Sequence, residues 1–378
     1  MPGTDPVILV GAGIGGLAAA LALQRAGIPV AVYEQATALA EVGAGLTLAA
    51  NGTRVLRHLG LGDVLDDLAV QPVRGAILHF RTGAELVGRP RASAHEERYG
   101  APYSQVHRAD LHRALAAAVQ SHDGACIRLG HRLADVGAAV DSVSAVFDNG
   151  AVARGALLVG CDGIRSSVRQ LLFGASEPRF TGYVAWRGLV PADRLPPGSV
   201  EPESAAWLGP GRFLTRYLVR RRTLLNYVAV ARTNRWTEEG WSVPATAEEV
   251  LAAFADFEPR AQAILAATPV GQCFRWGIFD REPLATWTRG RVSLLGDAAH
   301  PATPFLGQGA VMALEDAVVL ARAVAAAGAT PAALDRYEAA RRPRAALVMR
   351  ESAANGEQLT RCDPDHYDAA AHRDDETL

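Results

Sequence analysis

The chain has 378 residues, a length that predicts two domains or one elaborated domain. Its 38 basic residues are all arginine and nearly balance 40 acidic residues, which argues against a nucleic acid or an anionic membrane as a partner. The absence of lysine excludes Schiff-base chemistry, a phosphate-loop lysine and a lysine general base. A codon bias toward Ala, Arg and Gly explains this absence without reference to function.

The hydrophobic content of 49% and the charged content of 21% are typical of a globular protein with a sizeable core. The apolar stretch at residues 6–23 is broken by glycines and followed by Gln24 and Arg25, so it is expected to form a buried strand and helix rather than a membrane span. No signal peptide is recognisable, so secretion is not expected. The cysteines, Cys126, Cys161, Cys273 and Cys362, lie far apart and form no CxxC pair. We therefore expect a cytoplasmic protein without a zinc site or a disulfide framework.

The N-terminal residues predict a strand, a glycine turn, a helix and a second strand. Residues 7–10 are all apolar, residues 17–25 carry Leu and Ala at helical spacing, and residues 29–33 are again rich in β-formers. This order is that of a βαβ unit. A further helix is expected to start from Asn51 as its N-cap and to end at Gly60.

The rest of the chain alternates between helical and β-rich segments. The predicted elements are a helix over about 109–120, short strands between about 126 and 160, β-rich segments over 180–232, a helix at about 246–266, strands near 272–279 and 292–295, and a long helix over 309–327. Beyond about 352 the periodicity is lost and the residues are polar, so a frayed tail is expected.

Three glycines near the N-terminus, Gly11, Gly13 and Gly16, form a G-x-G-x-x-G that follows a strand and opens a helix. The first permits a tight turn, the second lets the backbone approach a pyrophosphate, and the third lets the helix pack on the strand. Glu34 ends the second strand, where a carboxylate can hold a ribose 2′-hydroxyl. Because Glu34 would repel a 2′-phosphate, the predicted dinucleotide is FAD or NAD rather than NADP.

A second motif covers residues 160–169, where Asp162 and Gly163 predict a turn and Ser166 predicts a helix start. Taken alone, this motif is as consistent with an ordinary strand-to-helix corner as with a cofactor site.

A third motif covers residues 296–310. Asp297 closes a predicted strand and can accept hydrogen bonds from sugar-like hydroxyls, and the helix that begins near Gly309 points its partial positive end into the preceding loop. A reduced flavin carries negative charge near N1 and C2=O. The motif therefore favours a flavin over a nicotinamide.

These three motifs resemble the fingerprints of the class A FAD-dependent monooxygenases, and the likeness covers about residues 5–350. Residues 183–188 and 280–284 are similar to the subgroup that contains salicylate hydroxylase, 3-hydroxybenzoate 6-hydroxylase, 6-hydroxynicotinate 3-monooxygenase and FAD-dependent urate hydroxylase. The resemblance implies an α/β fold, in which a Rossmann-like FAD-binding domain is interleaved with a β-sheet substrate domain and followed by a long C-terminal helix.

The resemblance also implies domain boundaries. The FAD-binding domain would comprise residues 1–75, 98–178 and 275–352, the substrate domain residues 76–97 and 179–274, and the polar tail residues 353–378.

The resemblance implies which residues hold the cofactor. Glu34 would bind the adenosine ribose, Arg108 would lie near the FAD phosphates, and Asp297 would bind the ribitol side. Gly45 would lie along the isoalloxazine edge. The segment from Pro304 through Gly307, Gln308 and Gly309 to Ala310 would pass the reactive face, and Asp162 and Arg169 would serve FAD and transient NADH or NADPH.

The implied reaction begins when NADH or NADPH reduces FAD, after which dioxygen forms a C4a-hydroperoxyflavin that hydroxylates an aromatic or heteroaromatic ring. The protein supplies a dry pocket, orientation and often a base. The candidate catalytic residues are His300, Pro304 and Tyr217, and the candidate substrate-binding residues are Thr47, Tyr183, Arg187, Tyr217 and Asn226.

The sequence departs from its relatives in the substrate base. Several of these hydroxylases use a histidine on a substrate-facing strand, but residues 180–232 contain none. His300 is as consistent with a structural hydrogen bond as with a base. Asn226 and Tyr227 are neighbours in a predicted strand, so they cannot both point into one pocket.

The sequence is also consistent with two other functions. The same fold could oxidise an alkene or a polycyclic natural product, or the protein could bind a flavin without turnover. The substrate, the choice between NADH and NADPH, and the choice between monomer and homodimer are not determined. The absence of lysine argues against amine oxidases and tryptophan halogenases, which use a lysine near the flavin.

Overall fold

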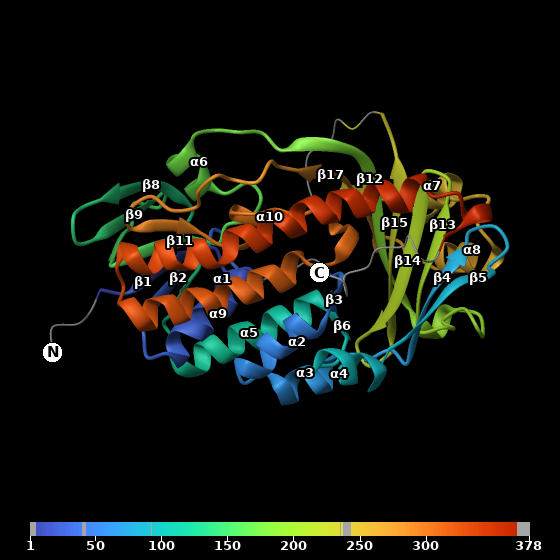
Figure 1. Ribbon diagram of the computed structural model, residues 1–378, viewed down its shortest axis with the longest axis horizontal. Helices are drawn as coiled ribbons and strands as arrows, with labels where there is room; N and C mark the ends of the chain where they lie inside the picture. The colour runs from blue at the N-terminus through green and yellow to red at the C-terminus, as the bar shows by residue number, and fades with distance from the viewer. Residues whose placement is uncertain (1–4, 40–42, 92, 235, 237–242, 369–378) are drawn as a thin grey trace.

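The computed structural model describes residues 5–39, 43–91, 93–234, 236 and 243–368. Two large sheets lie toward opposite ends of the molecule, and helices pack around the first of them (Figure 1). None of the helices in these ranges combines the length and apolar character needed to span a bilayer.

The first sheet has five parallel strands in the order β18-β11-β1-β2-β7. Its strands are β1 (Val7–Val10), β2 (Val30–Tyr33), β7 (Ile127–Arg128), β11 (Leu157–Gly160) and β18 (Val292–Leu294). Helix α1 (Ile14–Arg25) connects β1 to β2, as the βαβ prediction requires. All four residues of β1 and of β2 are buried, which explains their continuous apolar runs.

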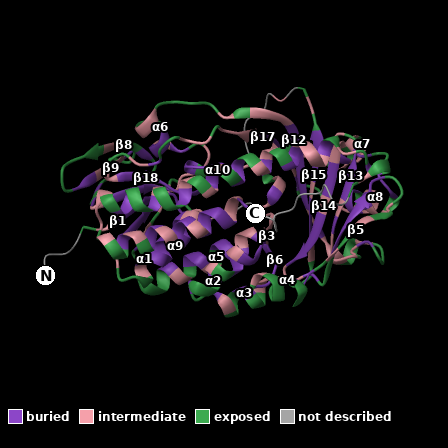
Figure 2. Ribbon diagram, in the orientation of Figure 1, coloured by how far each residue is buried: buried purple, intermediate pink, exposed green. Residues whose placement is uncertain are grey.

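Helices α5 (Arg108–His122) and α9 (Gly309–Ala327) pack against α1, and α9 has the predicted bounds. Helix α10 (Pro331–Arg361) lies along α9 and continues toward the second sheet (Figure 1). Figure 2 shows α9 as largely buried and the outer surfaces of α2 (Ala50–His58) and α3 (Gly62–Leu68) as more exposed.

The expectation of a frayed tail beyond residue 352 is wrong for the described residues, because α10 continues to Arg361. Two of its polar side chains there, Asn355 and Thr360, are buried and hydrogen-bonded. Asn355 Nδ2 donates to the Phe305 carbonyl at 2.9 Å. Thr360 Oγ1 lies 3.0 Å from the Tyr183 hydroxyl. The residues are polar because their partners lie in other elements, which local periodicity does not report.

The second sheet has eight strands in the order β16-β17-β12-β15-β14-β13-β4-β5. They are β4 (Arg74–His79), β5 (Glu85–Pro90), β12 (Arg179–Pro191), β13 (Ser204–Gly209), β14 (Arg212–Val219), β15 (Leu224–Arg232), β16 (Val243–Ala245) and β17 (Cys273–Asp280). All neighbours are antiparallel except β13 and β4.

Two short helices cover the outer face of this sheet, α7 (Ala247–Ala253) and α8 (Pro259–Ala266), where a single helix was predicted. The break follows from local chemistry, since Pro259 starts α8 and the Glu258 side chain accepts a hydrogen bond from the Arg260 N–H.

The remaining elements connect the two sheets or lie at their edges. They are β3 (Gly45–Leu48) paired with β6 (Ser104–His107), the three-stranded sheet of β8 (Leu133–Ala138), β9 (Val143–Phe147) and β10 (Val152–Gly155), helices α4 (Ser93–Tyr99) and α6 (Ser167–Phe173), and the 3-10 turns η1 (Ala192–Arg194), η2 (Gly296–Ala298), η3 (Pro304–Leu306) and η4 (Pro364–His366).

The N-cap prediction at Asn51 is wrong, because α2 already includes Ala50 and its N-cap residue is Ala49. The Asn51 side chain instead donates hydrogen bonds toward α9, to Gln308 and Glu315. The Asn51 amide is therefore bonded to residues that are distant in sequence, and it does not cap its own helix.

Candidate active site

A cavity of about 500 Å³ lies between the two sheets. It is bounded by the turn between β1 and α1, by β3, by residues 296–310 and by the inner face of the eight-stranded sheet. Of the predicted site residues, its lining includes Gly13, Gly45, Thr47, Arg108, Arg187, Tyr217, Asn226, Asp297, Pro304, Gly307, Gly309 and Ala310. Among the residues that the structure describes, the lining does not include Gly11, Gly16, Glu34, Asp162, Tyr183, His300 or Gln308.

The glycine turn opens one end of the cavity. A Cβ on Gly11 would lie 2.6 Å from the Cys161 carbonyl oxygen, and one on Gly16 would lie 2.0 Å from the Gly11 carbonyl oxygen, so both positions require glycine for packing. A Cβ on Gly13 or Gly163 would meet nothing within 4 Å, and both residues line the cavity. The turn therefore leaves open space beside the backbone of Gly13 and Gly163, and this space is called the cradle below.

Helix α1 starts in this cradle without a side-chain cap and without an acidic residue in its first turn. The N–H groups of its first turn have no intrahelical acceptors, and Ile14 and Gly15 line the cavity. Such a helix start binds phosphate groups well.

Glu34 braces the glycine turn from the end of β2. Its Oε2 accepts from the Ala12 N–H at 2.8 Å, and its Oε1 accepts from the Ala36 N–H at 2.8 Å. Each carboxylate oxygen keeps a further lone pair, so Glu34 can still accept a hydrogen bond from a ribose hydroxyl beside the turn.

Residues 160–169 form a closely hydrogen-bonded corner. Ser166 caps α6 by accepting from the Arg169 N–H at 2.9 Å, as its sequence position predicts. Asp162 accepts from the Ser166 hydroxyl and, at 3.1 Å, from the Val168 N–H, and burial raises the pKa of its carboxyl. Arg169 Nη1 donates to the Ala298 carbonyl at 3.3 Å, which ties this corner to the loop before α9.

Asp297 faces the cavity from the other side. The protein around it raises the pKa of its carboxyl by desolvation, and the nearby His300 and Arg108 partly offset this rise. Helix α9 begins beside it at Gly309, again without a side-chain cap or an acidic first turn. The free N–H groups of this turn and the Asp297 carboxylate thus present donors and an acceptor to one region of the cavity.

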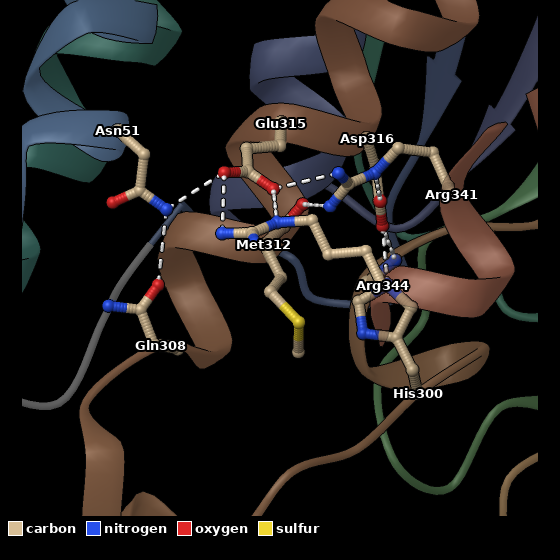
Figure 3. A network of polar contacts seen from close by, with 9 residues as sticks. Asn51, His300, Gln308, Met312, Glu315, Asp316, Arg341 and Arg344 are labelled. Atoms are coloured by element: carbon tan, nitrogen blue, oxygen red, sulfur yellow. Dashed lines mark hydrogen bonds and ion pairs between the residues drawn. The ribbon is translucent and has the colours of Figure 1, made fainter. Parts of the chain in front are cut away.

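His300 lies behind this loop in a buried polar network (Figure 3). Its Nε2 lies 2.5 Å from Asp316 Oδ2, which also accepts from the Gly296 N–H at 3.0 Å. The opposite oxygen, Asp316 Oδ1, accepts from Arg341 Nε at 2.7 Å. The structure therefore places His300 among structural partners and does not bring it together with Pro304 and Tyr217.

This network was missed in the sequence. The available signal was the pair Glu315 and Asp316 inside an otherwise apolar and Ala-rich helix, together with arginines at 341 and 344 in the next helix. Charges at such positions need partners when the helix is buried.

The inner face of the large sheet forms the far wall. Alternation along β15 points Asn226 into the cavity and Tyr227 to the opposite face, where the Tyr227 hydroxyl accepts from Thr268. Asn226 pairs across the sheet with Tyr217 on β14. Asn226 Oδ1 accepts from the Gly45 N–H at 2.7 Å, so the substrate-side wall touches β3 directly.

Two further arginines and a tyrosine line the wall and were not predicted. Arg89 lies in β5, Arg91 directly follows that strand, and the tyrosine is Tyr103. The guanidinium of Arg91 lies 4.1 Å from the centre of the Tyr103 ring. Arg187 lies near the rings of Phe274 and Trp276. The spacing of 89 and 91 was the only sequence signal that they share a side of the strand.

Tyr183 supports the loop instead of lining the cavity. Its hydroxyl donates to Glu357 at 3.0 Å, and its ring packs edge-on against Phe305, with ring centres 5.4 Å apart.

A family model described as an FAD binding domain matches residues 4–352. The chain belongs to this family. The cradle at Gly13 and Gly163, the two uncapped helix starts and the cavity carboxylate of Asp297 fit FAD, because together they offer space, donors for phosphate and an acceptor for ribityl hydroxyls.

Curated relatives of this FAD-binding protein are aromatic-ring monooxygenases. It is 40% identical to 3-amino-4-hydroxybenzoate 2-monooxygenase PtnB3 of Streptomyces platensis over 93% of this chain and 88% of that protein. It is 36% identical to 6-hydroxynicotinate 3-monooxygenase of Bordetella bronchiseptica, with 97% and 95% covered. It is also 36% identical to 3-hydroxybenzoate 6-hydroxylase 1 of Aquipseudomonas alcaligenes, with 91% and 86% covered.

Solved structures agree with this family. Klebsiella pneumoniae HpxO in complex with FAD and uric acid is 30% identical, with a TM-score of 0.86 over 97% of this chain and 91% of that one. A salicylate hydroxylase substrate complex is 25% identical, with a TM-score of 0.80 and 99% and 92% covered. The family, the α/β fold and the FAD cofactor predicted from the three motifs are thus confirmed.

Proposed function

We propose that this protein is an FAD-dependent monooxygenase that uses NADH or NADPH and dioxygen to hydroxylate a small aromatic acid. The observation that carries the proposal is one continuous cavity, which runs from the glycine turn of the parallel sheet to an arginine-lined and aromatic-lined face of the large sheet. FAD, when bound, supplies hydride acceptance from the nicotinamide and activation of dioxygen. The protein supplies binding, orientation and exclusion of water.

The cofactor half of the cavity assigns roles to backbone and carboxylate groups. The first-turn N–H groups of α1 would hold the diphosphate, Glu34 the adenosine ribose and Asp297 the ribityl chain. The N–H groups at Gly309 and Ala310 would face negative charge that develops on a reduced flavin. Arg108 lines the same half and adds a positive charge.

The substrate half favours a planar anion. Ile77, Phe213 and Trp276 supply apolar surface for a ring, while Arg89, Arg91 and Arg187 supply positive charge. Guanidinium groups suit carboxylates because they can donate two parallel hydrogen bonds. The curated relatives are named for hydroxybenzoates and a hydroxynicotinate, which are all ring carboxylates.

Proton transfer does not have an evident protein base. The described cavity lining contains no histidine, and burial holds the pKa of Tyr217 far above its usual value. A neutral Tyr217 hydroxyl would donate a hydrogen bond to a substrate oxygen rather than remove its proton. We therefore propose that Tyr217, Asn226 and Thr47 orient the substrate beside Pro304, and that ring activation depends on the substrate's own acidity.

We also propose that the two sheets correspond to the interleaved cofactor and substrate domains, with boundaries close to those given by the sequence. All four cysteines are free thiols, which supports a reducing compartment such as the cytoplasm.

The proposal is tested by recording the visible spectrum of the purified protein with FAD. NADH and NADPH oxidation and oxygen consumption are then followed with 3-hydroxybenzoate, 6-hydroxynicotinate and 3-amino-4-hydroxybenzoate. We expect a yellow protein whose oxidation of one nicotinamide is accelerated by a ring carboxylate. A protein that binds FAD but is reduced under none of these conditions would instead be a flavin-binding protein without turnover.

A further inference from the structure

We propose that Arg341 is a positioning residue for the loop that faces FAD. It would act through two adjacent carboxylates, Glu315 and Asp316, which hold opposite ends of residues 296–308, named here the cofactor loop. This inference rests on the proposed FAD-dependent function and assigns a role to the C-terminal helix α10, which carries Arg341 and does not itself start at the cofactor cradle.

The first arm holds the start of the cofactor loop. Arg341 Nε donates to Asp316 Oδ1 at 2.7 Å, and Asp316 Oδ2 accepts from the Gly296 N–H at 3.0 Å. The same oxygen lies 2.5 Å from His300 Nε2. Gly296 directly precedes Asp297, so this arm fixes the backbone that presents the cavity carboxylate.

The second arm holds the end of the cofactor loop. Arg341 Nη1 lies 2.7 Å from Glu315 Oε2, and Glu315 Oε1 accepts from Asn51 Nδ2 at 2.8 Å. Asn51 Nδ2 also donates to Gln308 Oε1 at 3.2 Å. Gln308 is the N-cap residue of α9, so this arm fixes the helix start at Gly309.

The planar fork of the arginine is what allows one side chain to serve both arms. Glu315 and Asp316 are consecutive on α9, and Figure 3 shows Arg341 between their carboxylates. Asp316 has no exposed surface and Arg341 is 4% exposed, so both charges need buried partners: Asp316 has Arg341 and His300, and Arg341 has Asp316 and Glu315. An ammonium group is a single point and cannot span two carboxylates in this way.

Two other residues of α10, Ser352 and Asn355, hold the middle of the cofactor loop. The Ser352 hydroxyl donates to the Thr303 carbonyl at 2.7 Å, and Asn355 Nδ2 donates to the Phe305 carbonyl at 2.9 Å. Loss of the Arg341 arms should therefore loosen the two ends, where Asp297 and Gly309 lie, without releasing the whole loop.

The test compares Asn51→Leu and Arg341→Lys with the control Thr53→Val. Thr53 is on the same helix as Asn51 and is also polar, but its hydroxyl donates to Pro102 and Ala50 and does not touch the loop. FAD affinity of each apoprotein is measured by quenching of FAD fluorescence, and stability of the same apoprotein by thermal unfolding.

We expect Asn51→Leu to weaken FAD binding about tenfold, the usual effect of losing a hydrogen bond, and to alter the fine structure of the bound flavin spectrum. Arg341→Lys should weaken it more, and Thr53→Val should leave both readouts as in the wild type even if its unfolding temperature falls. If Asn51→Leu folds and shows the FAD affinity and flavin spectrum of the wild type, the proposal is overturned. This outcome can be read even if Arg341→Lys does not fold. A wild-type protein that fails to bind FAD would instead refute the proposed function.

Discussion

Asn226 Oδ1 accepts a hydrogen bond from the Gly45 N–H at 2.7 Å, across 181 positions of sequence. This contact joins the substrate-side wall on β15 to β3, the strand expected along the flavin edge. The substrate and cofactor halves of the cavity therefore share a fixed boundary, and a change at either residue should affect the alignment of ring and flavin.

Replacement of Gly45 tests this boundary. An alanine Cβ would lie 2.5 Å from the Tyr217 ring and 2.7 Å from Cγ of Asn226, so one wall has to move. We expect Gly45→Ala to lower kcat/KM about 100-fold, because a displacement of about 1 Å from the reactive geometry has effects of this size. The control is Gly124→Ala, at a glycine without a positive φ whose Cβ would come no closer than 4.0 Å to its nearest neighbour, assayed for activity under the same conditions. Equal activity of Gly45→Ala and wild type would show that the boundary does not position the substrate.

Glu34 should contribute to FAD affinity through the glycine turn as well as through the ribose. Glu34→Ala removes the acceptor of the Ala12 and Ala36 N–H groups. We expect FAD to dissociate about 10- to 100-fold more readily, as for the loss of one or two charged hydrogen bonds. Gln35→Ala, at an exposed neighbouring position, serves as the control in the same fluorescence titration. Unchanged FAD affinity in Glu34→Ala would remove Glu34 from the cofactor site.

Asp297 should be needed for FAD retention but not for folding. Because the Asp297 side chain is exposed toward the cavity, Asp297→Ala should leave the unfolding temperature of the apoprotein about unchanged. FAD binding should weaken at least about tenfold because the ribityl hydroxyls lose an acceptor. Thermal unfolding and FAD titration of one preparation measure both effects, and tight FAD binding by this variant would contradict the assignment.

The arginines of the cavity wall should bind the carboxylate of the substrate. Arg187→Gln is expected to raise KM for a ring carboxylate about 10- to 100-fold, the range for a lost charged hydrogen bond. The KM for the nicotinamide should change little. Arg212→Gln is the matched control, because Arg212 also lies near aromatic rings but on the opposite face of the sheet. A similar loss with the uncharged amide of the same substrate would mean that Arg187 does not recognise charge.

Stability should depend on pH through His300 and Asp316. Burial lowers the pKa of His300, but Asp316 more than offsets this and raises it above 6.5, so its contribution is fully present below pH 6.5 and is lost as pH rises through the folded value. Burial raises the pKa of Asp316, but His300 and Arg341 hold it below 3.8, so its contribution is present above pH 3.8 and is lost in stronger acid. Between these limits both contributions are present.

The difference in unfolding free energy between wild type and His300→Gln should therefore be largest between about pH 4 and pH 6.5 and should shrink in more alkaline solution. Glutamine can still donate to Asp316 but does not titrate. Denaturant unfolding at several pH values measures this difference. A difference that stays constant from pH 5 to pH 9 would mean that His300 is not charged in the folded protein.

Much of the cofactor site could be predicted because its signals are local. The G-x-G-x-x-G places strand, turn and helix within a few residues, and the bounds of α9 follow from a long alanine-rich and mostly apolar pattern. Ser166 caps α6 by accepting a hydrogen bond from the N–H of Arg169, only three residues further along the chain.

The parts that could not be predicted depend on partners far apart in sequence. Asn51 is a residue type that commonly caps helices, but its side chain donates hydrogen bonds to Gln308 and Glu315 instead. Asn355 belongs to a polar segment that reads as a tail, yet it supports Phe305. His300 follows Asp297 closely in sequence but turns away from the cavity to Asp316. In each case the tertiary contact, not the local pattern, decides where the polar group points.

The proposed reaction requires the cavity to bring reduced flavin, dioxygen and a ring carboxylate together. The most direct measurement uses isotopically labelled dioxygen with FAD, the preferred nicotinamide and the acid that most accelerates its oxidation, followed by mass spectrometry of the product. We expect one labelled oxygen atom in the product for each nicotinamide oxidised. A product without the label, or nicotinamide oxidation that yields only hydrogen peroxide with every ring acid, would contradict it.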